Sequence, residues 1–75
     1  MSFYREQKKA FLDLDEIIKN EVIGNKSPLN ISRVILKLTS IHEVSELALK
    51  KRVNRWIEAH NDILKEKDGE LVFIE

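Results

Sequence analysis

The stretch RVNRWIEAHNDILKEKDGELVFIE, residues 52–75, decides the fold of this 75-residue chain. Its second half places apolar and charged residues on both sides of Asp68-Gly69. A type I′ turn needs positive φ at two successive residues, and Asp-Gly is a strong signal for it. The sequence therefore predicts a β-hairpin over residues 63–74, with Lys67 opposite Glu70 and a charged tip.

The first half of this stretch belongs to a predicted helix over residues 45–60. Ser45 is a suitable N-cap, and Asn61 is suited to the left-handed conformation that closes a helix. One side of the helix is apolar, because five residues recur at helical spacing: Leu49, Val53, Trp56, Ile57 and His60. A basic face lies opposite.

A shorter helix is predicted upstream, over residues 31–38. Apolar residues occupy its i, i+3, i+4 and i+7 positions, and Thr39-Ser40 is expected to end it. Residues 26–30 form a break with turn chemistry before it. The connection to the next helix, near residues 39–45, is long and lacks glycine.

The longest predicted helix lies near the N-terminus. Phe11, Leu14, Ile18 and Val22 share one face, and Gly24 is expected to end the helix in the left-handed cap conformation. Residues 3–10 extend the pattern backwards, either as the same helix or as a separate turn. Asp13, Asp15 and Glu16 are expected near a helix start, where acidic residues favour the helix dipole.

The composition indicates one small domain. Hydrophobic residues make up 43% and charged residues 35%, which suits a globular chain. No window approaches the roughly 20 apolar residues of a membrane span, and no signal-peptide core is present. Cysteine is absent, which excludes disulfides and thiolate zinc sites. We therefore expect a cytoplasmic protein.

The charge is unevenly distributed although the formal net charge is zero. Residues 25–57 hold seven cations against two anions, whereas residues 58–75 hold two cations against six anions. A basic middle between acidic ends can be an electrostatic footprint that the total conceals.

The order of elements resembles the winged helix–turn–helix family of DNA-binding domains, from about residue 13 to residue 74. Trp56-Ile57, the cap at His60-Asn61, and the two apolar strands carry the resemblance, and Pro28-Leu29 matches the short strand that often precedes the second helix. The expected fold is mainly α with a C-terminal β-hairpin. Residues 1–10 form an N-terminal helical extension, residues 11–60 a three-helix core and residues 61–75 the wing.

The resemblance implies a DNA-binding protein, either a transcriptional regulator or an accessory nucleic-acid factor, with its third helix in the major groove of double-stranded DNA. Carried over position by position, it nominates Lys50, Lys51, Asn54 and Arg55 for that groove. Lys26, Arg33 and Lys37 are nominated for phosphate contacts near the second helix. Each set has an alternative interpretation as ordinary solvated surface charge, with local pairs such as Lys51 or Arg55 beside Glu58.

Other features point to packing rather than to chemistry. Trp56 at helical spacing fits a core residue better than a base-stacking one. The wing is poor for DNA, because Glu66, Asp68 and Glu70 surround its two lysines. The two histidines lie too far apart to predict a metal site, and no nucleophile–base pair or phosphate-binding glycine loop occurs. We expect no enzyme, no cofactor and no small-molecule substrate.

Two expectations concern partners. The apolar residues of Met1–Tyr4 either pack on the domain or form a homodimer contact that would place two recognition helices about one DNA turn apart. The rival function is a winged-helix module for protein–protein contact, or a subunit of a larger assembly, that binds no DNA. Zero net charge and the acidic wing favour this rival.

Overall fold

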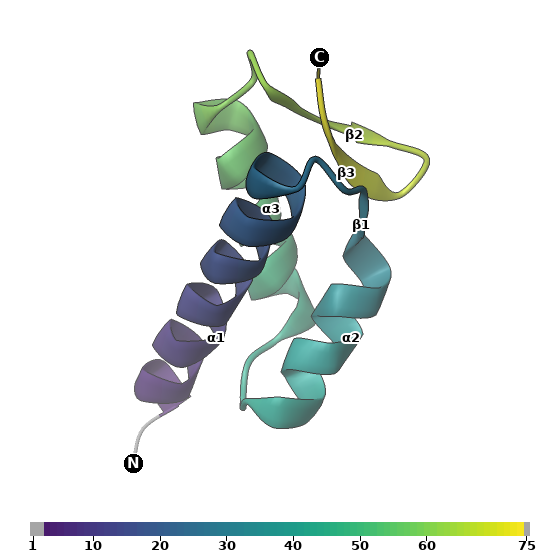
Figure 1. Cartoon of the computed structure of the whole chain (residues 1–75). Helices are drawn as coiled ribbons and strands as arrows, with labels where there is room; N and C mark the ends of the chain where they lie inside the picture. Colours follow the sequence, from purple (N-terminus) through teal and green to yellow (C-terminus); the bar gives the residue numbers. More distant parts are fainter. Residues whose placement is uncertain (1–2, 75) are drawn as a thin grey trace.

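A computed structural model describes residues 3–74 as three helices and a C-terminal hairpin, which confirms the predicted fold class. Side chains are described from residue 5 onwards. Figure 1 shows α1 (Phe3–Ile17) and α2 (Ile31–Ile41) beside each other, α3 (Glu46–Ala59) behind them and the hairpin at one end. Among the described residues, no helix combines the length and apolarity needed to cross a bilayer.

The first helix begins at Phe3, so residues 3–10 belong to the same helix as Phe11. The buried residues of α1 are Ala10 and Leu14, and the buried face continues with Ile18 and Val22. From Ile18 to Gly24 the chain continues as a π-helical segment, η1. The N–H of Asn25 then donates to the carbonyl of Asn20 at 3.0 Å, the i to i−5 pattern of a π-helix.

The predicted left-handed cap at Gly24 is wrong. Gly24 lies inside η1, and the C-cap residue Asn25 has φ −95°. The left-handed conformation occurs two residues after Gly24, at Lys26, whose φ is +57°. Just after it, the N–H of Ser27 donates to the carbonyl of Glu21 at 2.9 Å, so this carbonyl is satisfied by the residue that follows Lys26.

The second helix starts at Ile31, and Asn30 caps it by accepting from the N–H of Arg33 at 2.9 Å. The expectation that Thr39-Ser40 ends it is wrong, because α2 continues to Ile41. Both hydroxyls donate to carbonyls of the preceding turn, Thr39 to Leu36 at 3.0 Å and Ser40 to Lys37 at 2.8 Å. Because these bonds satisfy both hydroxyls within the helix, Thr39 and Ser40 do not have to end it. The connection to α3 is correspondingly shorter than expected, residues 42–45.

Ser45 is the N-cap of α3, as predicted, and its hydroxyl accepts from the N–H of Ala48 at 3.1 Å. The predicted left-handed Asn61 is wrong, because only Lys26 and Asp68 among the described non-glycine residues have positive φ. Instead, the carbonyl of His60 accepts from the N–H groups of Ile63 and Leu64. This turn leads from the helix into the hairpin without a left-handed residue.

The hairpin has the predicted register. Strand β2 (Leu64–Lys67) pairs with β3 (Glu70–Phe73) so that Lys67 faces Glu70 and Leu64 faces Phe73. Asp68 and Gly69 have φ of +53° and +80°, as a type I′ turn requires. A short strand β1 (Leu29–Asn30) pairs antiparallel with the other edge of β3, so the sheet order is β1-β3-β2.

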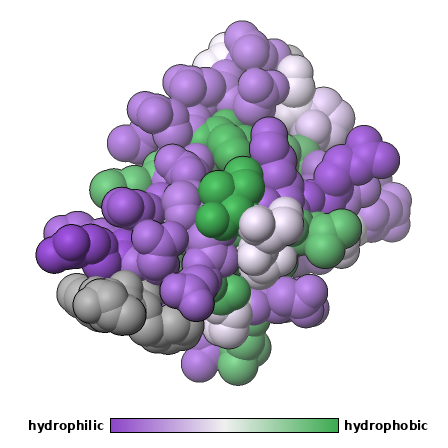
Figure 2. Space-filling view, turned by 90° about the horizontal axis from the view of Figure 1, so that it is seen from below, coloured by the Kyte–Doolittle hydropathy of each residue, from purple (hydrophilic) through white to green (hydrophobic). Residues whose placement is uncertain are grey.

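The core lies where the three helices meet the inner face of this sheet. Leu64 and Leu71 contribute one fully buried side chain from each hairpin strand, and they join Leu14, Ile18 and Leu49 from the helices. Seen from the end where α1 begins, Figure 2 shows a mostly hydrophilic surface interrupted by separate hydrophobic patches. Among the side chains from residue 5 to residue 74, four large apolar ones are exposed: Leu12, Leu36, Ile41 and Leu47.

Candidate nucleic-acid interface

The third helix presents the predicted basic face to solvent. Lys50, Lys51, Asn54 and Arg55 are all exposed. None of the four side chains has a hydrogen bond or an ion pair with a described residue, so the alternative pairing of Lys51 or Arg55 with Glu58 is not formed. At 100° per residue these positions cover a wide arc, with Lys51 and Arg55 toward α1 and Lys50 and Asn54 on the other side.

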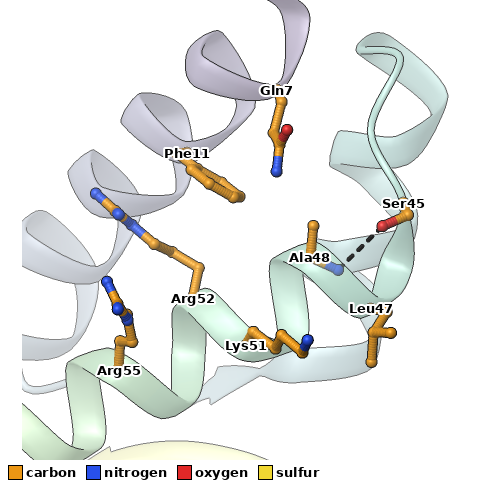
Figure 3. Close-up of a pocket in the computed structure, with 8 residues that line it drawn as sticks. All are labelled: Gln7, Phe11, Ser45, Leu47, Ala48, Lys51, Arg52 and Arg55. Carbon is orange, nitrogen blue, oxygen red and sulfur yellow. Dashed lines mark hydrogen bonds between the residues drawn. The ribbon is translucent and has the colours of Figure 1, made fainter. Parts of the chain in front are cut away.

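Two adjoining hollows lie between α1 and α3, and we call them together the α1–α3 groove. The larger has a volume of about 400 Å³ and the smaller about 280 Å³. The groove has four cationic residues in its lining: Lys8, Lys51, Arg52 and Arg55. Figure 3 shows Gln7 and Phe11 pointing from α1 toward α3, and Arg52 reaching from α3 toward α1.

Arg52 connects α3 to α1 through Asp15. Its Nε donates to one carboxylate oxygen at 3.1 Å and its Nη2 to the other at 2.7 Å, while Trp56 Nε1 donates to the first oxygen at 2.7 Å. Burial alone would raise the pKa of Asp15, but the hydrogen bonds from Arg52 and Trp56 hold that pKa below its usual value. Arg52 also lies over the Phe11 ring, 5.0 Å from its centroid.

His42 makes a second connection, between the start of the α2–α3 connection and α1. Its Nε2 lies 2.7 Å from Asp13 Oδ2, and its Nδ1 lies 3.3 Å from Glu6 Oε1. The hydrogen bond to Asp13, followed by that to Glu6, raises the pKa of His42 although burial opposes the shift. Because both nitrogens face carboxylates, the doubly protonated imidazolium is the form that this site favours.

These two connections correct the interpretation of the acidic residues as neighbours of a helix start. Since α1 begins at Phe3, Asp13 and Asp15 lie in its second half and flank its buried face on opposite sides. Asp13 faces His42, and Asp15 faces Arg52 and Trp56. They join elements that are distant in sequence, so helical periodicity within α1 gives no direct signal for them.

The His42 connection predicts a pH dependence of stability. The pKa of His42 is higher in the folded chain than in the unfolded chain, so protonation of His42 stabilises the fold. This stabilisation is complete below the unfolded-state pKa and is lost as the pH rises through the folded-state pKa. We expect the urea concentration at the unfolding midpoint to decrease as the pH rises above about 6.5, the ordinary pKa of histidine. His42→Gln should flatten this change, whereas His60→Gln should leave it in place. An unchanged pH profile in His42→Gln would contradict the assignment.

The residues nominated near the second helix are divided between two places. Arg33 and Lys37 line a hollow of about 500 Å³ between η1, β1 and α2, together with Glu21 and Glu70. Lys26 lies over the Phe73 ring instead, 4.7 Å from its centroid. Because Asn30 occupies the N–H of Arg33, phosphate contacts at this end of α2 would depend on the side chains rather than on that N–H.

The other candidate residues of the sequence analysis either pack against the domain or lie among acidic residues. Trp56 is half-buried against the core, stacks on His60 with ring centroids 4.9 Å apart, and uses its N–H on Asp15. The hairpin tip carries Lys65 and Lys67 among exposed acidic residues. Within the described residues, no group of three or more His, Cys, Asp or Glu side chains could hold a metal ion. The predicted dimer contact rests on Met1–Tyr4, whose side chains lie outside the described part.

The α3 face, the α1–α3 groove and the Arg33–Lys37 hollow are three polar surfaces of the described residues, and the first two share Lys51 and Arg55. Comparisons with protein-family models, with curated proteins and with solved structures find no match for this chain. Its arrangement of three helices and a small antiparallel sheet is compatible with a winged helix.

Proposed function

We propose that this chain is a small winged-helix DNA-binding protein that places α3 in the major groove. The observation that supports this proposal most is the exposed α3 face, where the side chains of Lys50, Lys51, Asn54 and Arg55 have no hydrogen-bond or ion-pair partner among the described side chains, residues 5–74. Side chains that are not used inside the domain can meet base edges and phosphates without breaking internal contacts. The position of this helix directly before a β-hairpin supports the same assignment.

The four side chains suit different parts of duplex DNA. A guanidinium such as that of Arg55 can bind guanine through two parallel hydrogen bonds, and the amide of Asn54 can bind adenine similarly. The ammonium groups of Lys50 and Lys51 act as point charges and suit phosphates. Arg55 and Asn54 lie on different sides of the exposed arc, so the helix would contact both walls of the groove.

Secondary contacts are assigned to α2, where Arg33 and Lys37 lie one turn apart and are exposed. Lys26 would contribute only by leaving the Phe73 ring. The wing is assigned a structural role, because acidic residues at its tip repel phosphate. In this proposal the protein regulates transcription or assists another nucleic-acid process, and a two-fold dimer would bring two α3 helices to successive major grooves.

The test is binding of a fluorescent duplex by the double variant Lys51→Glu/Arg55→Glu. We expect its affinity at low salt to fall by about two orders of magnitude, because two favourable phosphate or base contacts become repulsive. For the parent chain, four to seven phosphate contacts give a logarithmic salt slope of about −4 to −6. Fluorescence anisotropy at several salt concentrations measures both quantities.

The matched control is Lys65→Glu/Lys67→Glu, which makes the same change of net charge on the hairpin. It should retain duplex affinity within about threefold, since only long-range electrostatics change. The proposal is wrong if the parent chain binds no duplex at low salt. It is also wrong if the α3 and hairpin variants lose affinity equally, because the effect would then reflect net charge rather than a contact.

A further inference from the structure

The α1–α3 groove differs in charge from the rest of the molecule. The chain as a whole is neutral, yet the described residues that line the groove include four cations and no acidic residue. The only carboxylate bonded to any of these cations in the described part is that of Asp15, which Arg52 and Trp56 already use. Lys51 and Arg55 are thus available at the rim, and the groove attracts negative charge.

The groove also carries apolar surface beside its cations. The half-buried Phe11 lines the groove from α1, and Ala48 lines it from α3. Leu12, 58% exposed, lines the smaller hollow, and Leu47, 61% exposed, lines the larger one. Leu12 and the half-buried Phe11 ring line the smaller hollow together, whereas Leu47 borders the larger hollow on α3 and points away from α1 (Figure 3). Exposed apolar side chains of this kind are what a partner's apolar side chains cover.

We propose that the α1–α3 groove binds an acidic amphipathic segment of a partner protein. Carboxylates of the segment would pair with Lys51 and Arg55 at the rim, while its apolar side chains would cover Leu12, Phe11 and Leu47. A sugar–phosphate backbone would meet the cations but has no apolar face to place over the leucines. The combination therefore favours a protein segment over nucleic acid at this groove.

This inference goes beyond the proposed DNA-binding function and does not rest on it. The two surfaces share Lys51 and Arg55, whereas Leu12 and Leu47 belong to the groove alone. Variants of the leucines therefore test the groove without removing a nominated DNA contact. Where both functions hold, an acidic segment and a duplex compete for the same two cations.

The experiment uses the full chain and a fluorescein-labelled synthetic peptide of about four helical turns, with leucine on one face and glutamate on the other. We expect Leu12→Ser/Leu47→Ser to weaken peptide binding about tenfold, because two apolar contacts are lost, and to leave duplex binding within about twofold. Leu36→Ser is the matched control, since Leu36 is 65% exposed on α2, away from the groove. It should bind the peptide like the parent chain.

Two further peptides test what the groove recognises. A scrambled peptide of identical composition should bind about tenfold more weakly, because its charges and leucines no longer lie on separate faces. A peptide with lysine in place of glutamate should not bind. Circular dichroism establishes that each protein variant is folded, which is expected because the substituted leucines are exposed.

Three results would overturn the inference. The first is equal peptide affinity in the parent chain and the Leu12→Ser/Leu47→Ser variant, which would indicate attraction by charge alone. The second is equal affinity for the ordered and scrambled peptides. The third is self-association of the free chain that the same leucine variant abolishes, which would assign the groove to a second copy of this chain. None of these results alters the outcome of the duplex experiment.

Discussion

Asp15→Ala is expected to lower the free energy of unfolding by about 2–3 kcal/mol, because it removes the acceptor of three hydrogen bonds from Arg52 and Trp56. The side chain of Asp15 is 15% exposed, so its carboxylate is held mainly by these donors. The Arg52 side chain is 32% exposed in the parent chain, so water can hydrate its guanidinium once Asp15 is removed. The expected loss of stability is therefore smaller than for a fully buried ion pair. Urea unfolding at neutral pH measures it.

Two companion variants isolate the cause. Glu16→Ala removes an exposed acid from the neighbouring position of α1 and should change stability by no more than about 0.5 kcal/mol. Asp15→Asn keeps the shape and one acceptor but loses the charge, so it should fall between Asp15→Ala and the parent chain. Equal stabilities of Asp15→Ala and Glu16→Ala would show that the contact between α1 and α3 contributes little.

Leu14→Ala is expected to cost about 3 kcal/mol, because the Leu14 side chain is completely buried among the three helices. Removal of its methyl groups leaves a cavity that the close-packed surroundings fill only in part. In a domain of this size such a loss is a large fraction of the total stability. The measurement is the same urea unfolding experiment, read as a shift of the midpoint at constant slope.

The control for Leu14→Ala is two residues away on the same helix. Leu12→Ala makes the same chemical change at a position that is 58% exposed, and it should alter stability by no more than about 0.5 kcal/mol. If Leu12→Ala were as costly as Leu14→Ala, the assignment of the buried face of α1 would be wrong. The pair therefore tests the helical phase that also places Asp13 and Asp15 on opposite flanks.

Local chemistry made much of the fold predictable. Asp68-Gly69 determines the turn and hence the whole hairpin register, because a two-residue loop allows one pairing. Ser45 and the apolar spacing of Leu49 and Val53 determine the start and the buried side of α3 in the same way. These signals act within a few residues of one another, which is the range over which sequence patterns are dependable.

The remaining features depend on contacts between distant residues. Arg52 meets a carboxylate 37 positions earlier in the chain, a contact that no local pattern around Arg52 indicates. His42 likewise meets Glu6 36 positions earlier. The exposure of Lys50, Lys51, Asn54 and Arg55 followed from helical spacing. The α1–α3 groove could not be predicted from helical spacing, because it forms between two helices that lie side by side in the fold.

The π-helical segment η1 has a consequence for how this chain can vary in evolution. Each turn of a π-helix contains one residue more than the corresponding α-helical turn, because its hydrogen bonds reach one residue further back. Loss of one residue between Ile18 and Val22 would turn their spacing from i, i+4 into i, i+3, which still keeps both on one face of an α-helix. Homologous chains are therefore expected to tolerate a single-residue deletion at this site.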